Sequence, residues 1–153
     1  MERVTKSAEE SKKFAANFAK KLKGGDVLCL YGELGSGKTT FVQGLAEGLG
    51  IKKRILSPTF ILMRSYEISG LANWRISELE KTKTFYHIDL YRIDKPQETE
   101  MLGLQEILDN PQNIIAIEWA EKIKEILPPR RIDIHFKHID YKDSRLIKII
   151  NFL

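Results

Sequence analysis

Eight consecutive residues have the composition and spacing of a phosphate-binding loop. Residues 32–39 read Gly-Glu-Leu-Gly-Ser-Gly-Lys-Thr and satisfy the pattern G-x-x-x-x-G-K-[ST] at every fixed position. Glycines let backbone N–H groups curve around a phosphate, and a helix that starts at the loop presents the positive end of its dipole. Lys38 would place its charge on the β- and γ-phosphates, and the Thr39 hydroxyl would bind Mg²⁺. The pattern therefore predicts a nucleoside triphosphate site built from Gly32, Glu33, Leu34, Gly35, Ser36, Gly37, Lys38, Thr39 and Thr40.

An enzyme with such a P-loop also needs an acidic residue near the metal ion, at the end of a neighbouring strand. Two apolar runs end in a carboxylate: residues 85–89 end in Asp89, and residues 114–118 end in Glu118. One of these carboxylates would hold Mg²⁺ while the other positions or polarises the attacking water. The spacing leaves open which carboxylate does which. His87, His135 and His138 are interpreted as structural or solvated side chains and not as catalysts.

The motif is compatible with three classes of function. No N-K-x-D run is present to read guanine, so ATP is favoured over GTP. A P-loop ATPase would use both carboxylates. A small-molecule kinase would use Asp89 to deprotonate a substrate hydroxyl and Arg130-Arg131 as lid arginines, but 153 residues leave little room for a substrate domain and a lid. The third class is an adaptor that is switched by nucleotide binding without turnover.

Strands and helices alternate along the chain in the order that a P-loop fold requires. Apolar periodicity, capping residues and glycines predict helices over 7–23, 38–49 and 94–108, and a short helix that ends at Pro128. They predict strands over 26–31, 60–63, 84–91 and 113–118, and a late antiparallel pair over 132–137 and 146–150. Residues 67–83 are expected to form a polar surface excursion. The predicted fold is α/β and P-loop NTPase-like: one domain over 1–153, with a mainly parallel sheet flanked by helices and a C-terminal antiparallel strand pair.

Composition narrows the class of protein further. The chain has 153 residues, 42% of them hydrophobic and 30% charged, and a formal net charge of +4, which is typical of a folded protein and not of a disordered one. No apolar run approaches the ~18 residues that span a bilayer. The start of the chain does not resemble a secretory signal, and one cysteine, Cys29, excludes a disulfide framework. We therefore expect a cytoplasmic protein with no membrane partner and Cys29 in its core.

Four motifs, in this order, resemble the bacterial TsaE family. They are residues 32–41, the Ser-Pro-Thr-Phe run at 57–60, the Tyr-His-Ile-Asp-Leu-Tyr-Arg run at 86–92 and the Ile-Glu-Trp-Ala-Glu run at 117–121. The resemblance covers roughly residues 3–150. Members of this family are small P-loop ATPases that assist synthesis of N6-threonylcarbamoyladenosine in tRNA, at the adenosine in position 37. The resemblance therefore implies an accessory ATPase that uses ATP and Mg²⁺.

The resemblance also implies roles for individual residues and partners. It gives Mg²⁺ to Thr39 and Glu118, and it makes Asp89 the Walker B-like acid. It places three further side chains near the nucleotide or its γ-phosphate: Thr59 in a switch-like loop, Trp119 and Arg145. It implies docking onto TsaB and TsaD, the pair that transfers the threonylcarbamoyl group, and leaves open whether tRNA is touched directly. The chain departs from the family in a longer 67–83 segment, which contains Trp74.

Overall fold

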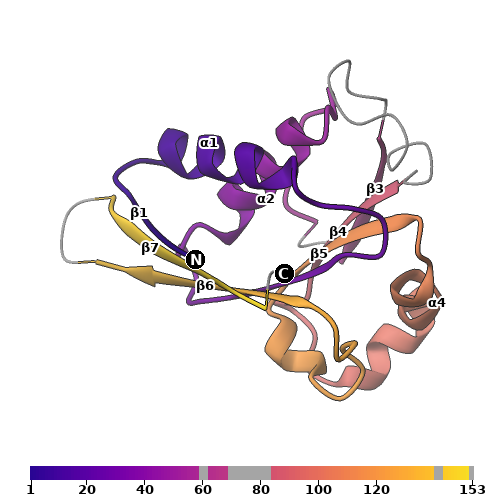
Figure 1. Ribbon diagram of the computed structural model, residues 1–153. Coiled ribbons are helices and arrows are strands. Elements are labelled where there is room, and N and C mark those ends of the chain that lie inside the picture. The colour runs from indigo at the N-terminus through magenta and orange to yellow at the C-terminus, as the bar shows by residue number, and fades with distance from the viewer. Residues whose placement is uncertain (59–61, 69–83, 140–142, 152–153) are drawn as a thin grey trace.

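The computed structural model describes residues 1–58, 62–68, 84–139 and 143–151 (Figure 1). The expectations for Thr59, Trp74 and the strand over 60–63 lie wholly or partly outside these residues. The helices and strands, with η for 3-10 helices, are β1 (Glu2–Thr5), α1 (Ala8–Ala19), β2 (Val27–Tyr31), α2 (Lys38–Gly48), β3 (Met63–Glu67), β4 (Thr84–Asp89), η1 (Pro96–Leu102), α4 (Leu104–Asp109), β5 (Asn113–Glu118), η2 (Ala120–Ile123), β6 (Ile132–His138) and β7 (Arg145–Ile150).

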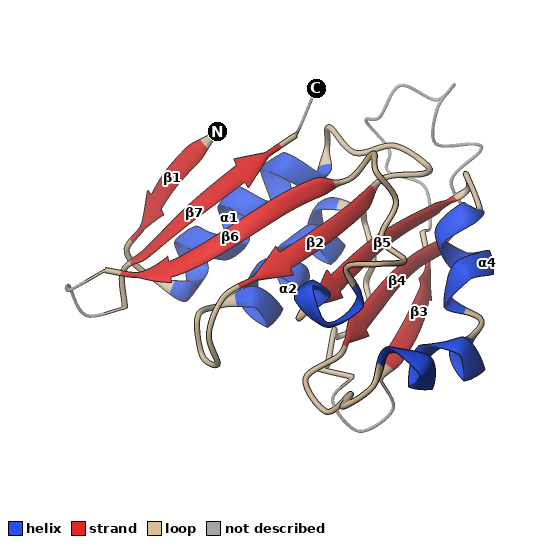
Figure 2. Cartoon of the chain, turned by 90° about the horizontal axis from the view of Figure 1, so that it is seen from below, coloured by secondary structure: helices blue, strands red, loops and turns tan. Residues whose placement is uncertain are grey.

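One seven-stranded sheet, in the order β1-β7-β6-β2-β5-β4-β3, organises the chain (Figure 2). The central strands β6, β2, β5 and β4 are parallel to one another, and β7, β1 and β3 pair antiparallel at the two sides. This confirms the predicted α/β fold, including the late antiparallel pair. Parallel strands end at the same edge of a sheet, so the loop after β2 lies beside the ends of β4 and β5. In register, Asp89 is opposite Glu118.

Helices cover both faces of the sheet, and each face has its own apolar core (Figures 1 and 2). On one face α1 and α2 pack over side chains that include Phe85 and Ile114, with Phe41 of α2 in edge contact with Phe136 at 5.4 Å. On the other face α4 and η2 cover a second cluster that includes Cys29. Cys29 is fully buried, which confirms the prediction of a core cysteine, and this burial raises the pKa of its thiol to about 12.

The two helices on the first face touch through glycines. A Cβ atom added at Gly44 of α2 would overlap the carbonyl oxygen of Lys12, and one added at Gly48 would overlap that of Ala16. Because both carbonyl oxygens belong to the backbone of α1, α1 and α2 approach each other more closely than larger side chains at these two positions would allow. This contact holds the carboxyl half of α2 against α1, over the sheet.

Some elements differ from the sequence prediction. The 2–5 segment, which we did not expect to form a strand, is β1 at the edge of the sheet, with three of its four residues exposed. The helix predicted over 94–108 is two elements, because Gly103 adopts a left-handed conformation (φ 62°) between η1 and α4. Helix α1 ends at Ala19, four residues before the predicted end. Within the described ranges, no helix combines the length and apolar character that crossing a bilayer requires.

Candidate nucleotide-binding site

The P-loop connects β2 to α2 at the carboxyl edge of the parallel strands. Gly37 precedes the helix in a left-handed conformation (φ 101°), which favours glycine. A Cβ at Gly32 would lie 2.7 Å from Ser36 Oγ and 2.9 Å from the carbonyl oxygen of Phe136, so a side chain there would clash. Helix α2 is 11 residues long, and its amino end directly follows the loop. This is the arrangement of an anion site at a helix terminus.

Lys38 lies inside this loop and is 4% exposed. Its Nζ donates hydrogen bonds to the carbonyl oxygens of Gly32 at 2.6 Å and Glu33 at 2.9 Å, and it lies 4.2 Å from the centre of the Trp119 ring. Burial lowers the pKa of Lys38, while the carboxylate of Glu118 opposes that shift. A phosphate in the loop would compete with two neutral carbonyls for this ammonium group.

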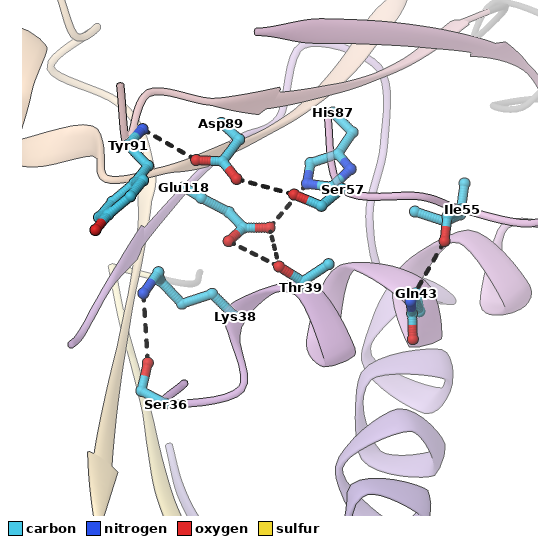
Figure 3. Close-up of polar contacts among 10 residues, drawn as sticks. All are labelled: Ser36, Lys38, Thr39, Gln43, Ile55, Ser57, His87, Asp89, Tyr91 and Glu118. Carbon is cyan, nitrogen blue, oxygen red and sulfur yellow. Dashed lines mark hydrogen bonds and ion pairs between the residues drawn. The ribbon is translucent and has the colours of Figure 1, made fainter. Parts of the chain in front are cut away.

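Thr39 and Glu118 are in direct contact. The Thr39 hydroxyl lies 2.9 Å from Oε1 and 3.0 Å from Oε2 of Glu118, so its hydrogen is shared between the two carboxylate oxygens (Figure 3). His87 Nε2 lies 2.8 Å from the same Oε1. Glu118 is 2% exposed and His87 is fully buried. A hydroxyl and a carboxylate, which are both hard oxygen ligands, therefore meet at the first turn of α2.

Asp89 has different partners. Its Oδ1 accepts a hydrogen bond from the backbone N–H of Tyr91 at 3.0 Å, and its Oδ2 accepts one from the Ser57 hydroxyl at 3.1 Å. Ser57 and Pro58 are the last described residues before the segment that carries Thr59. The two carboxylates that the sequence could not distinguish are thus adjacent in register but held by separate groups.

Trp119 closes one side of the loop from the end of β5. Its backbone is left-handed (φ 60°), a conformation that large side chains rarely adopt, and its N–H donates to the carbonyl oxygen of Leu30 at 3.2 Å. The ring contacts that of Tyr91, with centroids 5.2 Å apart. Both rings line a hollow of about 300 Å³. Its lining also includes Lys38, Thr39, Asp89 and Glu118.

A second hollow of about 350 Å³ adjoins the first and shares Gly35, Gly37 and Thr40 with it. Its lining includes Ser7, Gly37, Thr40 and Arg145. Arg145 Nη2 lies 3.5 Å from the carbonyl oxygen of Gly35, and His138, which pairs with Arg145 across the β6–β7 ladder, lies 3.2 Å from the same oxygen. The end of the β6–β7 hairpin therefore contacts the P-loop backbone.

The structure brings most of the predicted residues together. Lys38, Thr39, Asp89, Glu118 and Trp119 line the first hollow, and Arg145 reaches the loop from the second. Sequence reasoning missed the contacts of His87, Ser57 and His138 with the site. His87 could have been found, because alternate residues of a strand share a face and it lies two positions before Asp89.

Across the part of the chain that the structure describes, no group of three or more His, Cys, Asp or Glu side chains is arranged to hold a metal ion by itself. Mg²⁺ in phosphate sites is bound instead through one or two carboxylates, water and the phosphates. The pairing of Thr39 with Glu118 fits that donor set.

Comparison with known proteins identifies the family. A model of the family described as threonylcarbamoyl adenosine biosynthesis protein TsaE matches residues 5–147. The tRNA threonylcarbamoyladenosine biosynthesis protein TsaE of Bacillus subtilis is 41% identical over 133 residues, which are 87% of this chain and 75% of that protein. Its counterpart from Rickettsia typhi is 40% identical over 152 residues, covering 96% and 94% of the two chains.

A solved structure agrees with this identification. The crystal structure of YdiB from Bacillus subtilis aligns with 97% of this chain and 83% of that one, at a TM-score of 0.76 and 37% identity. Both the fold and the sequence are therefore shared over nearly the whole length. The chain belongs to the TsaE family, whose role is in tRNA threonylcarbamoyladenosine biosynthesis.

Proposed function

We propose that this protein binds and hydrolyses ATP with Mg²⁺, and that it thereby supports threonylcarbamoylation of tRNA as an accessory to the TsaB–TsaD pair. The observation that carries the proposal is the contact between Thr39 and Glu118 at the amino end of α2, beside the buried ammonium group of Lys38. These residues supply a hydroxyl, a carboxylate and a positive charge at one point, which is the set that a P-loop uses for a metal-bound triphosphate.

The site's own residues suggest a division of labour. Lys38 would exchange the carbonyl oxygens of Gly32 and Glu33 for phosphate oxygens, while the backbone N–H groups of the loop bind the β-phosphate. Thr39 and Glu118 would hold Mg²⁺, which when bound would neutralise charge on the β- and γ-phosphates. Asp89 would orient the attacking water, because its carboxylate is held by Ser57 and by the Tyr91 N–H and not by Thr39.

The second hollow is suited to the remainder of the nucleotide. Thr40, which follows Thr39 at the start of α2, lines both hollows and so joins the first to the second. Arg145 offers a planar guanidinium group there, which can stack on a base or bind an α-phosphate. We propose that the ribose and adenine lie between the amino end of α1 and the start of β7.

The alternative of a kinase is less well supported. Its proposed lid arginines, Arg130 and Arg131, directly precede β6, whose first residue pairs with Leu28 near the start of β2. They therefore lie at the amino edge of the parallel strands, whereas the P-loop follows the carboxyl end of β2. Arg131 donates to Asp133 at 2.9 Å, a contact that holds it at this opposite edge.

A low intrinsic rate is expected. Among the described residues that line the first hollow, Lys38 is the one positively charged side chain. P-loop enzymes without a second cation on the γ-phosphate are slow until a partner supplies one or orders the site, with an effect of up to ~10³–10⁵. We therefore propose that the TsaB–TsaD pair stimulates hydrolysis.

The test is phosphate release at fixed ATP and Mg²⁺, with the purified TsaB–TsaD pair titrated in and tRNA present or absent. Release should be slow for the isolated chain, rise with the pair and disappear in Lys38→Ala. Lys137→Ala, which removes an exposed lysine on β6, is the matched control and should behave as the wild type. A fast isolated enzyme, indifferent to the pair, or release that requires an added hydroxyl acceptor would overturn the proposal.

A further inference from the structure

Among the described residues, the buried imidazole of His87 makes a polar contact through only one of its two ring nitrogens. The side chain is fully buried on β4, and its Nδ1 has no hydrogen-bond partner within the described part of the chain. A buried polar atom without a partner costs folding free energy, so the Nδ1 edge of the ring does not stabilise the fold. The polar contact that His87 does make is therefore the feature to explain.

That contact is with the Glu118 carboxylate. His87 Nε2 lies 2.8 Å from Oε1 (Figure 3). Because a carboxylate only accepts hydrogen bonds, the ring donates from Nε2. In the register of β4 with β5, His87 is opposite Ala116, and Glu118 is two residues further along on the same face. The small side chain of Ala116 leaves room for the imidazole to reach along the sheet to the carboxylate.

The contact fixes how Glu118 faces Thr39. Oε1 accepts from both His87 and Thr39, whereas Oε2 has Thr39 as its one partner among the described residues. With Oε1 anchored by the imidazole, the carboxylate stays in place to accept the hydroxyl hydrogen of Thr39.

We propose that His87 is a positioning residue: its Nε2–H holds the Glu118 carboxylate so that Glu118 and Thr39 together form a Mg²⁺ site of high affinity. This inference rests on the proposed function, because it assumes that the site takes a metal-bound nucleotide. His87 does not touch the nucleotide in this scheme and acts through Glu118. Loss of a group that hydrogen-bonds a metal-binding side chain typically lowers metal affinity or activity by about 10- to 100-fold.

Three variants test this assignment. His87→Leu removes the donor, His87→Asn places an amide too close to the strand to reach Glu118, and His87→Gln carries an amide N–H at about the distance of Nε2. His135→Leu is the control, because His135 is an exposed residue of β6 that stacks on Tyr31 and is not one of the hydrogen-bond partners of Glu118, which are Thr39 and His87 among the described residues. Thermal unfolding of each variant establishes that the protein is folded.

The readout is metal binding and not turnover. Mn²⁺ affinity of the ADP-bound protein is measured by electron paramagnetic resonance, and ADP affinity in EDTA is measured by calorimetry. We expect Mn²⁺ affinity to fall about 10- to 100-fold in His87→Leu and His87→Asn, with near wild-type values in His87→Gln and His135→Leu. ADP affinity in EDTA should be unchanged in all of them, which a general loss of structure would not allow.

Each contrary outcome has a distinct meaning. Wild-type Mn²⁺ affinity in folded His87→Leu, or a loss in His87→Gln as large as in His87→Leu, would overturn the positioning role while the proposed function stands. Failure of all three variants to fold would also overturn it, because His87 would then be a structural residue. If the wild-type protein binds neither ADP nor Mn²⁺ with ADP, the proposed function fails, and this inference fails with it.

Discussion

Replacing Lys38 with alanine should separate the energetics of phosphate binding from those of folding. The Lys38 ammonium donates to two carbonyl oxygens at 2.6 and 2.9 Å and lies 4.2 Å from the centre of the Trp119 ring. A phosphate would replace neutral acceptors with a charged one, and such a hydrogen bond contributes about 1.5–3 kcal/mol. Since ~1.4 kcal/mol corresponds to a tenfold change in affinity, the variant should bind triphosphate about 10- to 100-fold more weakly.

Folding stability should change far less in the same variant. Burial lowers the pKa of Lys38, so desolvation of its charge already offsets part of what its contacts contribute. Gly32 is half-buried and Glu33 is exposed, so we expect water to replace the ammonium group at their carbonyl oxygens after truncation. We expect the free energy of unfolding to change by no more than about 1 kcal/mol.

Calorimetric titration with a non-hydrolysable ATP analogue, together with urea unfolding, measures both quantities. The wild type should also lose affinity as pH rises through the lowered pKa of Lys38, because the ammonium group then loses its charge, whereas Lys38→Ala should not show this step. Lys137→Ala, which removes an exposed charge on β6, is the control. Unchanged affinity in Lys38→Ala would refute the assignment of Lys38 to phosphate, and a stability loss as large as the binding loss would refute the separation.

Other features of the structure give three further predictions. Glu118→Gln and Asp89→Asn should each lower the rate of hydrolysis about a hundredfold or more, while nucleotide affinity in EDTA, measured by calorimetry, stays unchanged. A wild-type rate of hydrolysis in either variant would show that the replaced residue has no catalytic role. Cys29 should resist alkylation at pH 8 until urea unfolds the chain, because burial raises its pKa to about 12; rapid native labelling by mass spectrometry would contradict its place in the core. Gly44→Ala should lower the free energy of unfolding by about 1–3 kcal/mol through overlap with the α1 backbone, and an unchanged urea midpoint would show that the helices can separate without cost.

Local patterns predicted the elements that carry the phosphate site. The P-loop and the strand over 113–118 were recognised correctly because glycine spacing and a run of buried residues are properties of adjacent positions. The separate partners of Glu118 and Asp89 could not be predicted, since Thr39 and Ser57 reach them from distant parts of the chain. The carboxylates have the same sequence context, an apolar strand end, and only tertiary contacts distinguish them.

Edge strands and helix interruptions were harder to predict for a different reason. β1 is short and largely exposed, and it owes its conformation to backbone pairing with β7 at the other end of the chain. The exposed ion pair between Glu2 and Lys148, at 3.1 Å, joins residues too far apart in the sequence to predict that pairing. Gly103 was visible in the sequence, but a glycine inside a helical pattern is often tolerated, so its left-handed conformation could not be deduced from its identity.

The contact between Lys38 and Trp119 gives this protein a built-in optical probe of its own site. A cation 4.2 Å from the centre of an indole ring shifts the energy of its excited state, so any movement of the ammonium group toward a phosphate should change the emission of Trp119. The chain has one other tryptophan, Trp74, which can be replaced by phenylalanine to leave a single emitter. Stopped-flow fluorescence of that variant would then follow the arrival and release of the nucleotide in real time, without a label.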